Sequence, residues 1–310
     1  MSAPDIIIQE VCPRDGLQIE PVFVPTQEKV ALIDRLSALG FTRIEAGSFV
    51  SPRAVPALSD GDEVFRSIAR PTGTVFVALV PNLKGAERAL AAGADELNFV
   101  MSASETHNRA NMGMRHVASL EALAAVTGMA GCRIPINATV ATAFGCPFEG
   151  EQQETKVLDF IRRYLDLGAE GITLADTTGM ANPKLVRQRV KSALQLVPAE
   201  KLTLHFHNTR GLGLLNVMAA YDAGARRFDA ALGGLGGCPF APGASGNVCT
   251  EDLVNLCHET GIATGLDLEA LLTIARDLPR LVGHLVPGQV IKAGLARDLH
   301  PVPEALRQMA

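Results

Sequence analysis

Short apolar segments alternate with longer amphipathic segments from one end of the chain to the other. The short segments are rich in Val, Ile, Leu and Phe and indicate buried strands. The stretches between them repeat apolar residues three and four positions apart and indicate helices. The eight predicted strands cover residues 6–11, 43–46, 74–80, 96–101, 134–141, 171–175, 202–207 and 227–231. Helices are predicted at residues 26–39, 62–69, 82–91, 114–127, 151–167, 183–196, 211–223, 250–260 and 267–281.

A glycine stands where four of the predicted helices give way to strands. The segments ALGFTRIEA, AAGADELNF, DLGAEGITL and DAGARRFDA place Gly40, Gly93, Gly168 and Gly224 at these points. Glycine tolerates the left-handed backbone conformation that ends a helix. Strands that alternate with helices predict a parallel sheet, and eight such units predict a (β/α)8 TIM barrel, here with extra C-terminal helices.

The competing architecture is an open, doubly wound sheet. Its dinucleotide fingerprint, GxGxxG after the first strand, is missing, and GGLGGCP at residues 233–239 has a different spacing and follows the eighth predicted strand. No linker rich in Pro, Gly or Ser divides the chain. We therefore expect one domain over residues 1–310, with the barrel in about 1–232 and a loop plus C-terminal helices in about 233–310.

Composition narrows the classes of function. The 310 residues are 47% hydrophobic and 20% charged, with a net charge of -5 and no basic block, which argues against nucleic-acid binding. The six cysteines form no CxxC pair, so neither a zinc ribbon nor a thioredoxin-like motif is predicted. The first residues lack the pattern of a secretory signal, and no apolar run has the length of a membrane helix. We expect a cytoplasmic location with reduced thiols.

Polar side chains gather at the carboxyl ends of the predicted strands, where TIM barrels carry their catalytic residues. The first strand ends with Arg14 and Asp15, the second with Glu45 and Ser48, the sixth with Asp176 and Thr177, and the seventh with His205 and His207, while the loop after the eighth carries Cys238 and Asn247. All of these residues are therefore expected on one rim of the barrel.

His205 and His207 indicate a metal site. Residues two apart in a strand face the same side, so both imidazoles can converge on one point opposite Asp15. Two imidazoles, a carboxylate and the amide oxygen of Asn247 would form a ligand set that suits Mg²⁺ or Mn²⁺, and Zn²⁺ is also compatible. The alternative is that the two histidines only bond neighbouring backbone groups.

The remaining candidates also have structural alternatives. Arg14 and Asp15 would be an ordinary surface pair, except that Cys-Pro before them and glycine after them predict a sharp turn at the barrel mouth. Glu45 follows a buried strand and needs a partner. Asp176 is either an active-site carboxylate or a helix cap or loop organiser. Cys238 lies in the glycine-rich run LGGLGGCPFAPGASGN and is expected to be reactive, whereas the other cysteines are expected to be packing residues.

With these residues in place, the chain resembles the 3-hydroxy-3-methylglutaryl-CoA lyases over nearly its whole length. The similar motifs are EVCPRDGLQIE (10–20), IEAGSFVSPRAVPALSD (44–60), SASETHN (102–108), FGCPFEG (144–150) and GGLGGCPFAPGASGNVCTEDLV (233–254). The resemblance implies a divalent metal, Mg²⁺ or Mn²⁺, bound by Asp15, His205, His207 and Asn247. It also implies that Arg14 stabilises an enolate, that Cys238 transfers a proton, that Glu45 and Asp176 affect activity, and that Gln18, Ser48 and Thr177 line the acyl pocket.

The implied reaction is a retro-Claisen cleavage of 3-hydroxy-3-methylglutaryl-CoA, or a related 3-hydroxy-acyl-CoA, to acetyl-CoA and acetoacetate or the matching keto acid. Either Asp15 or His205 would accept the proton of the C3 hydroxyl. The resemblance further implies a homodimer or larger homo-oligomer and a place in leucine degradation and ketone body metabolism.

Two departures from the family pattern leave the acyl group open. Asn208 and Arg210 stand in HFHNTRG where the family commonly has HxHDTYG, and Ile19 and Pro21 stand where it often has an acidic–basic pair. A lyase for another acyl-CoA, such as citramalyl-CoA, is therefore one alternative. A Claisen-condensing acyltransferase of the isopropylmalate or homocitrate synthase type is a second, and a barrel that binds without catalysis is a third.

Overall fold

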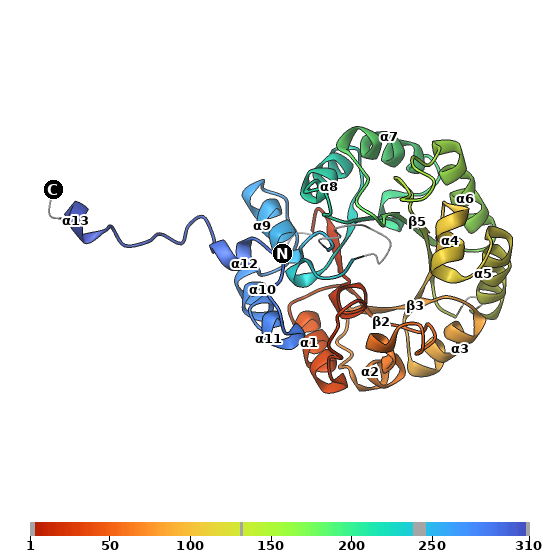
Figure 1. The fold of residues 1–310 in the computed structure, drawn as a ribbon, viewed down its shortest axis with the longest axis horizontal. Coiled ribbons are helices and arrows are strands. Elements are labelled where there is room, and N and C mark those ends of the chain that lie inside the picture. Colours follow the sequence, from red (N-terminus) through yellow and green to blue (C-terminus); the bar gives the residue numbers. More distant parts are fainter. Residues whose placement is uncertain (1–3, 131–132, 238–245, 308–310) are drawn as a thin grey trace.

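The computed structural model of the chain describes residues 4–130, 133–237 and 246–307, and its centre is a closed barrel of eight parallel strands (Figure 1). The strands are β1 (Ile7–Glu10), β2 (Arg43–Ser48), β3 (Val75–Val80), β4 (Glu96–Ser102), β5 (Ile136–Ala141), β6 (Gly171–Asp176), β7 (Leu202–Phe206) and β8 (Arg227–Ala230). Each strand pairs with its neighbours in the sequence, and β1 pairs with β8 to close the barrel. The (β/α)8 prediction is confirmed.

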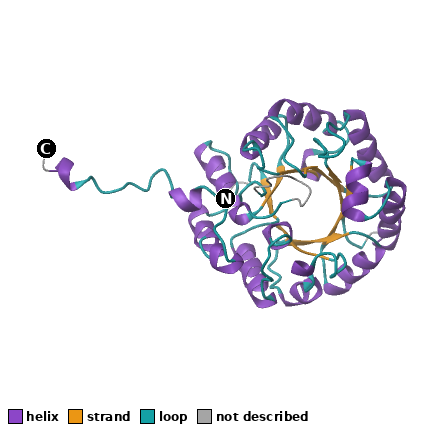
Figure 2. Cartoon of the chain, in the orientation of Figure 1, coloured by secondary structure: helices purple, strands orange, loops and turns teal. Residues whose placement is uncertain are grey.

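Helices form a ring around the strands (Figure 2). Those between strands are α1 (Thr26–Ala38), α2 (Gly61–Ser67), α3 (Leu83–Ala92), α4 (Glu105–Met112), α5 (His116–Ala130), α6 (Glu154–Asp166), α7 (Pro183–Ala193) and α8 (Gly213–Asp222). Those after β8 are α9 (Thr250–Glu259), α10 (Leu268–Ala275), α11 (Leu278–Val282), α12 (Val290–Ala293) and α13 (Glu304–Arg307). In Figure 1, α9 to α12 lie beside the barrel next to α1, and α13 ends an extended segment that leads away from it. Among the described residues, none of the helices combines the length and the apolar character that crossing a bilayer requires.

Two features of the helices differ from the prediction. Helix α4 was not predicted, because its sequence ETHNRANM offers no apolar periodicity; its start is instead stabilised by Ser104, whose hydroxyl accepts the amide N–H of His107 at 3.0 Å. Residues 267–281 form α10 and α11 rather than one helix. Pro279 has no N–H to donate to the carbonyl of Ala275, so a continuous helix would lack that hydrogen bond.

The predicted glycine punctuation is present in the structure. Gly40, Gly93, Gly168 and Gly224 have φ angles of 93°, 91°, 96° and 109°. A side chain in this left-handed region would be strained. Each of these glycines follows the end of a helix by one or two residues and lets the chain turn back toward the next strand.

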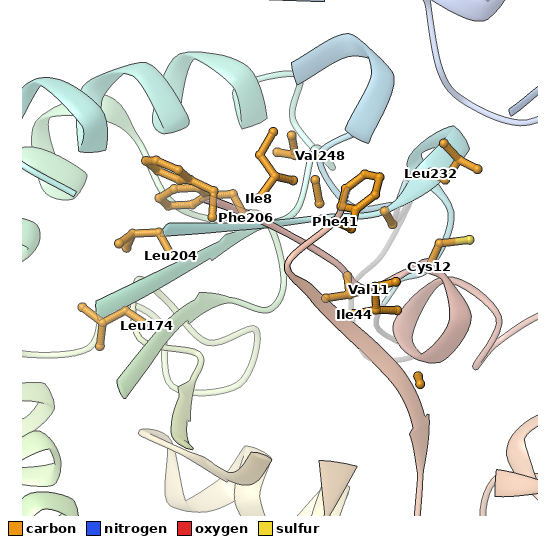
Figure 3. Packing of buried hydrophobic residues seen from close by; sticks show 14 of the residues in the cluster. Ile8, Val11, Cys12, Phe41, Ile44, Leu174, Leu204, Phe206, Leu232 and Val248 are labelled. Carbon is orange, nitrogen blue, oxygen red and sulfur yellow. The ribbon is translucent and has the colours of Figure 1, made fainter. Parts of the chain in front are cut away.

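Alternation along the strands divides apolar from polar residues. Leu174, Leu204 and Phe206 are buried in the hydrophobic layer between the strands and the helices (Figure 3). The alternate residues Thr173 and His205 line a cavity inside the barrel. The apolar layer holds the helices onto the barrel, since burial of each such side chain contributes about 1.5–3 kcal/mol, and it leaves the interior free for polar groups.

Candidate active site

Arg14 and Asp15 lie on a single turn of π-helix, Cys12–Gly16, directly after β1. The amide N–H groups of Arg14, Asp15 and Gly16 all lie near the carbonyl oxygen of Val11, at 3.1, 2.7 and 3.2 Å. A Cβ atom at Gly16 would come within 3.1 Å of Cys12 Sγ, so the turn favours glycine. Turns of this kind are frequent at functional sites. Here the turn directs both Arg14 and Asp15 into the barrel mouth, where they line the cavity.

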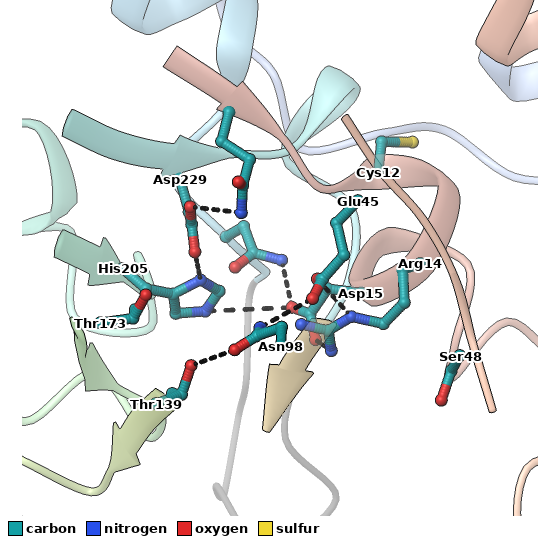
Figure 4. A network of polar contacts seen from close by, with 12 residues as sticks. Cys12, Arg14, Asp15, Glu45, Ser48, Asn98, Thr139, Thr173, His205 and Asp229 are labelled. Carbon is teal, nitrogen blue, oxygen red and sulfur yellow. Dashed lines mark hydrogen bonds and ion pairs between the residues drawn. The ribbon is translucent and has the colours of Figure 1, made fainter. Parts of the chain in front are cut away.

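The guanidinium of Arg14 holds two carboxylates (Figure 4). Its Nε donates to Glu45 Oε2 at 2.5 Å, and its Nη1 donates to Asp15 Oδ1. Asn98 Nδ2 donates to the second oxygen of Glu45 at 2.8 Å. The register of β2 shifts between Glu45 and Gly47, a bulge of the kind that re-aims side chains next to active sites. Glu45 is fully buried, and these contacts supply the partner that its carboxylate requires.

His205, His207 and Asp15 bring three candidate metal-ligating atoms together. The Nε2 atoms of the two histidines are 3.0 Å apart, and they lie 4.0 and 3.8 Å from Asp15 Oδ2. Asn247 Nδ2 donates to the same carboxylate oxygen at 2.7 Å. All four side chains are buried. The structure therefore brings together the four residues whose types suggested a metal site.

This set of donor atoms fits a divalent cation. His205 Nδ1 lies 3.1 Å from Asp229 Oδ2. Burial alone would lower the pKa of His205, but the hydrogen bond to Asp229 and the charges of Asp229 and Asp15 outweigh it and raise that pKa. Loss of the Nε2 proton on metal binding would leave Nδ1–H on Asp229 and a lone pair on Nε2. Burial, and then the charge on His205, lower the pKa of His207 to about 3, so that ring is neutral at pH 7. One candidate ligand atom from each of Asp15, His205 and His207 lies within 4.8 Å of the others, so one cation could bind all three once the facing imidazole nitrogens are deprotonated. Among the described residues, the buried Oδ1 of Asn247 has no hydrogen-bond partner, so it retains capacity for a cation.

Asp15 is charged in this setting. Burial alone would raise the pKa of its carboxyl group. The charges of Arg14, His205 and His207, together with the Asn247 hydrogen bond, outweigh burial and lower that pKa to about 2. Metal binding requires this ionised carboxylate and would release any proton held by the two imidazoles.

The cluster forms the polar wall of a cavity of about 330 Å³. The polar part of the lining also contains Asn98, Thr139, Thr173 and Asp229, and apolar lining is supplied by Val50, Ala54, Val55, Leu79, Pro81, Val100 and Met112. This volume lies at the lower end of the range for small-molecule sites.

The other predicted site residues divide into two groups. Gln18 and Thr177 line the cavity. Ser48 is buried and accepts the amide N–H of Val50 at 3.4 Å, and it is not among the described residues that line the cavity. Cys238 falls outside the described residues.

Asp176 organises a loop. Its Oδ1 accepts the amide N–H groups of Met180 and Ala181 at 2.7 and 3.0 Å, and the side chain is fully buried. It shares the alternation of Leu174 rather than that of the cavity-lining residue Thr173. Its position therefore favours the loop-organising alternative, in which it shapes the segment between β6 and α7.

Replacing Asp176 with asparagine should make the metal-free protein gain relative stability as pH rises. Burial raises the pKa of Asp176 to about 6, above the ordinary value of 3.8, so the folded state holds this proton more tightly than the unfolded chain. This contribution is present at low pH and is lost between about pH 4 and pH 6. Urea unfolding should show the variant's advantage growing by on the order of 2–3 kcal/mol from pH 4 to pH 8. An advantage that does not change with pH would contradict the assignment.

Sequence reasoning missed several buried polar residues of the cavity wall, among them Asn98, Thr139, Thr173, Asp229 and His107. Asp229 lies on β8 and contacts His205, and His107 lies on α4 with Nδ1 2.7 Å from the hydroxyl of Ser102. Burial lowers the pKa of His107 to about 4. A carboxylate inside a buried strand needs a partner, and this argument, which identified Glu45, would also have identified Asp229.

Comparison with known proteins places this fold and site in a family. The sequence profile of the HMGL-like family matches residues 5–278. The chain belongs to the HMGL-like family. This HMGL-like protein is 41% identical to hydroxymethylglutaryl-CoA lyase of Bacillus subtilis over 285 residues, which are 92% of this chain and 95% of the relative. It is 43% identical to (R)-citramalyl-CoA lyase of Chloroflexus aurantiacus over 300 residues, 93% of this chain and 95% of the relative.

A solved structure extends the comparison to the fold. The HMG-CoA lyase of Acinetobacter baumannii, in complex with coenzyme A and 3-methylmalate, is 59% identical, with a TM-score of 0.95. The match covers 98% of this chain and all of the other. The HMGL-like protein is therefore a carbon–carbon lyase with a TIM-barrel fold, as predicted.

Proposed function

We propose that this HMGL-like lyase cleaves 3-hydroxy-3-methylglutaryl-CoA to acetyl-CoA and acetoacetate. The observation that carries the proposal is the placement of the Arg14 guanidinium and of the Asp15–His205–His207 cluster on one wall of one cavity. Cleavage of the bond between C2 and C3 needs a proton acceptor for the C3 hydroxyl and positive charge for the enolate. The cavity offers both, and acetoacetate formation would place the enzyme in leucine degradation or ketone body metabolism.

We assign Mg²⁺ or Mn²⁺ to Asp15, His205, His207 and Asn247. Oxygen and imidazole ligands without thiolate suit these ions. The ion would supply the positive charge that lowers the pKa of the substrate hydroxyl and orients it. The protein contributes the buried setting in which that charge is effective.

Each step then uses groups of this chain. Asp15, which faces the cavity, accepts the C3 hydroxyl proton, and the C2–C3 bond breaks as the ketone forms. The alternative acceptor, His205, would have no free lone pair, because its Nδ1–H is directed at Asp229 and its Nε2 is assigned to the ion. The bonding electrons move onto the thioester fragment as an enolate, which Arg14 stabilises. Cys238 gives its proton to C2, which completes acetyl-CoA. Glu45 holds the Arg14 side chain in place.

Two residues that depart from the family pattern contact neighbouring loops. Arg210 Nη1 donates to the carbonyls of Thr178 and Gly179 at 3.1 and 2.7 Å, and Asn208 Oδ1 accepts the amide N–H of Gly213 at 2.9 Å. Neither is among the described residues that line the cavity. This supports the hydroxymethylglutaryl substrate. The 43% identity to a citramalyl-CoA lyase makes citramalyl-CoA the second candidate.

A homodimer or larger homo-oligomer of one-domain subunits belongs to the same proposal. Ile19, Val22, Phe23 and Leu285 expose 43%, 51%, 47% and 83% of their surface. The ion pair between His284 and Glu20 holds these two segments side by side. Exposed apolar side chains that gather in one place are typical of subunit interfaces.

Steady-state assays with a panel of thioesters test the substrate. We expect kcat/KM for 3-hydroxy-3-methylglutaryl-CoA to exceed that for citramalyl-CoA by about tenfold or more, the range that one altered group in an acyl pocket typically gives. Activity should disappear with a chelator and return with Mn²⁺ or Mg²⁺. A preference for citramalyl-CoA would replace the first substrate with the second. Release of free CoA from acetyl-CoA and a 2-oxo acid would instead indicate a condensing transferase.

A further inference from the structure

A chain of hydrogen bonds runs along the inner side of the adjacent strands β2, β1, β8 and β7 and ends at His205. Arg43 Nε, on β2, donates to Gln9 Oε1 on β1 at 3.0 Å. Gln9 Nε2 donates to Asp229 Oδ1 on β8 at 3.1 Å, and Asp229 Oδ2 accepts from His205 Nδ1 at 3.1 Å. Glu96, on β4, forms an ion pair with Arg43 and fixes the start of the chain. Gln9 and Asp229 are each 6% exposed, so water competes little for these contacts.

The direction of every hydrogen bond in this chain follows from its first group. A guanidinium can only donate, so the oxygen of Gln9 must face Arg43 and its NH2 must face Asp229. An ionised carboxylate can only accept, so Asp229 accepts a hydrogen bond from Gln9 on one oxygen and from His205 on the other. The hydrogen of the neutral His205 ring is thereby held on Nδ1. Its lone pair is on Nε2, the atom that faces Asp15 (Figure 4) and lies 3.0 Å from His207 Nε2.

We propose that Asp229 is a positioning residue, oriented by Arg43 through Gln9, that sets the tautomer and ring orientation of His205 so that Nε2 is available as a ligand. The inference rests on the metal site proposed above. A carboxylate behind a ligating histidine typically contributes 10- to 100-fold, as an order of magnitude, to metal affinity. In this barrel the direction of that contact is set by a residue two hydrogen bonds away.

The Asp229→Asn substitution tests the direction of the chain. Because Gln9 must still donate, the new amide turns its oxygen toward Gln9 and its NH2 toward His205 Nδ1. An NH2 group can only donate, so the ring hydrogen moves to Nε2 and the lone pair no longer faces Asp15. We expect the Kd for Mn²⁺, measured by the EPR signal of free Mn²⁺, to rise about 10- to 100-fold.

A swapped double variant, Gln9→Glu with Asp229→Asn, is the matched control. The carboxylate at position 9 accepts from both Arg43 and the amide at position 229, so the oxygen of that amide is again directed at His205 Nδ1. The double variant has the same net charge and side-chain sizes as the wild type. Its Mn²⁺ affinity should be about tenfold tighter than that of Asp229→Asn alone. Selective ¹⁵N-histidine NMR of the metal-free proteins at alkaline pH should show the His205 hydrogen on Nδ1, Nε2 and Nδ1 in the wild type, single variant and double variant.

These measurements separate the positioning role from the metal site. If the wild type binds Mn²⁺ and Asp229→Asn binds it within about twofold, with the hydrogen still on Nδ1, the positioning role is wrong and the metal site stands. If the double variant keeps the wild-type melting temperature but shows neither tighter binding than the single variant nor a return of the hydrogen to Nδ1, the directional chain is wrong. If the wild type does not bind Mn²⁺, the metal site is wrong, and the NMR spectra alone decide whether Asp229 sets the tautomer.

Discussion

Replacing Asp15 with asparagine should lower kcat/KM for acyl-CoA cleavage by about four orders of magnitude, near the upper end of what one catalytic acid–base group contributes. The carboxylate is the one anionic member of the candidate metal cluster, and it also accepts hydrogen bonds from Arg14 and Asn247. An amide of the same size removes the charge and keeps only one acceptor oxygen, so its NH2 group must face one of the two donors, Arg14 or Asn247. Steady-state kinetics with saturating Mn²⁺, together with a Mn²⁺ titration, should show loss of both turnover and metal affinity.

Asp222→Asn provides a matched control, because Asp222 is an exposed residue at the end of α8. That variant should keep wild-type kinetics and metal affinity, since surface substitutions away from special contacts change little. Circular dichroism and thermal unfolding would establish that the Asp15 variant is folded. A folded Asp15→Asn protein that retains a tenth of the wild-type kcat/KM would remove Asp15 from the proposed mechanism.

The barrel itself could be predicted from the sequence because its signals are local. Each strand is a short apolar run, and glycines such as Gly93 and Gly224 mark the return from helix to strand with φ angles of 91° and 109°. The closing pair, β1 with β8, joins segments more than two hundred residues apart in the chain, as with Gln9 and Asp229. We predicted that pairing only because the sequence contains eight strand–helix units, a number that is typical of a closed barrel.

Other elements depend on contacts that periodicity does not reveal. Helix α4 is mostly polar, and its helicity depends on the Ser104 cap and on Asn108. The Asn108 side chain bonds the Ser102 amide and the Ser119 hydroxyl at 3.0 and 2.9 Å. These partners lie in β4 and α5. The break before α11 could have been predicted from Pro279 alone. The prediction of one helix over residues 267–281 therefore missed a local signal.

The candidate site was predictable as far as strand ends reveal it. The rule that catalytic residues follow the carboxyl ends of barrel strands identified Arg14, Asp15, His205 and His207. It also placed Asp176 among them, because the end of a strand shows which rim of the barrel a residue occupies but not whether its side chain faces the cavity. Alternation supplies the missing information, since Asp176 is one residue out of step with Thr173 and Thr177, which line the cavity. The functional roles of all these residues remain predictions.

Replacing Arg14 with lysine should lower kcat by about 100- to 1,000-fold, the cost of removing one preorganised donor for a developing oxyanion. Arg14 spans two carboxylates with a planar fork, Nε toward Glu45 and Nη1 toward Asp15. A lysine keeps the charge, but its compact ammonium lacks the planar fork that fixes the two carboxylates in this geometry. Lysine is preferable to methionine here, because methionine would leave the buried Glu45 without a cation and destabilise the fold by about 3–5 kcal/mol.

The Arg14→Lys and Asp15→Asn variants should differ in metal binding. Lysine at position 14 retains the positive charge next to the cluster and removes no proposed ligand, so the Kd for Mn²⁺ should stay near the wild-type value while kcat falls. Arg35→Lys is the matched control, because the Arg35–Asp277 ion pair is exposed and contributes little. If Arg14→Lys loses metal affinity in step with activity, Arg14 acts by holding Asp15 in place. If kcat falls and metal affinity does not, the guanidinium itself acts on the enolate, because the altered step is then one that follows assembly of the site.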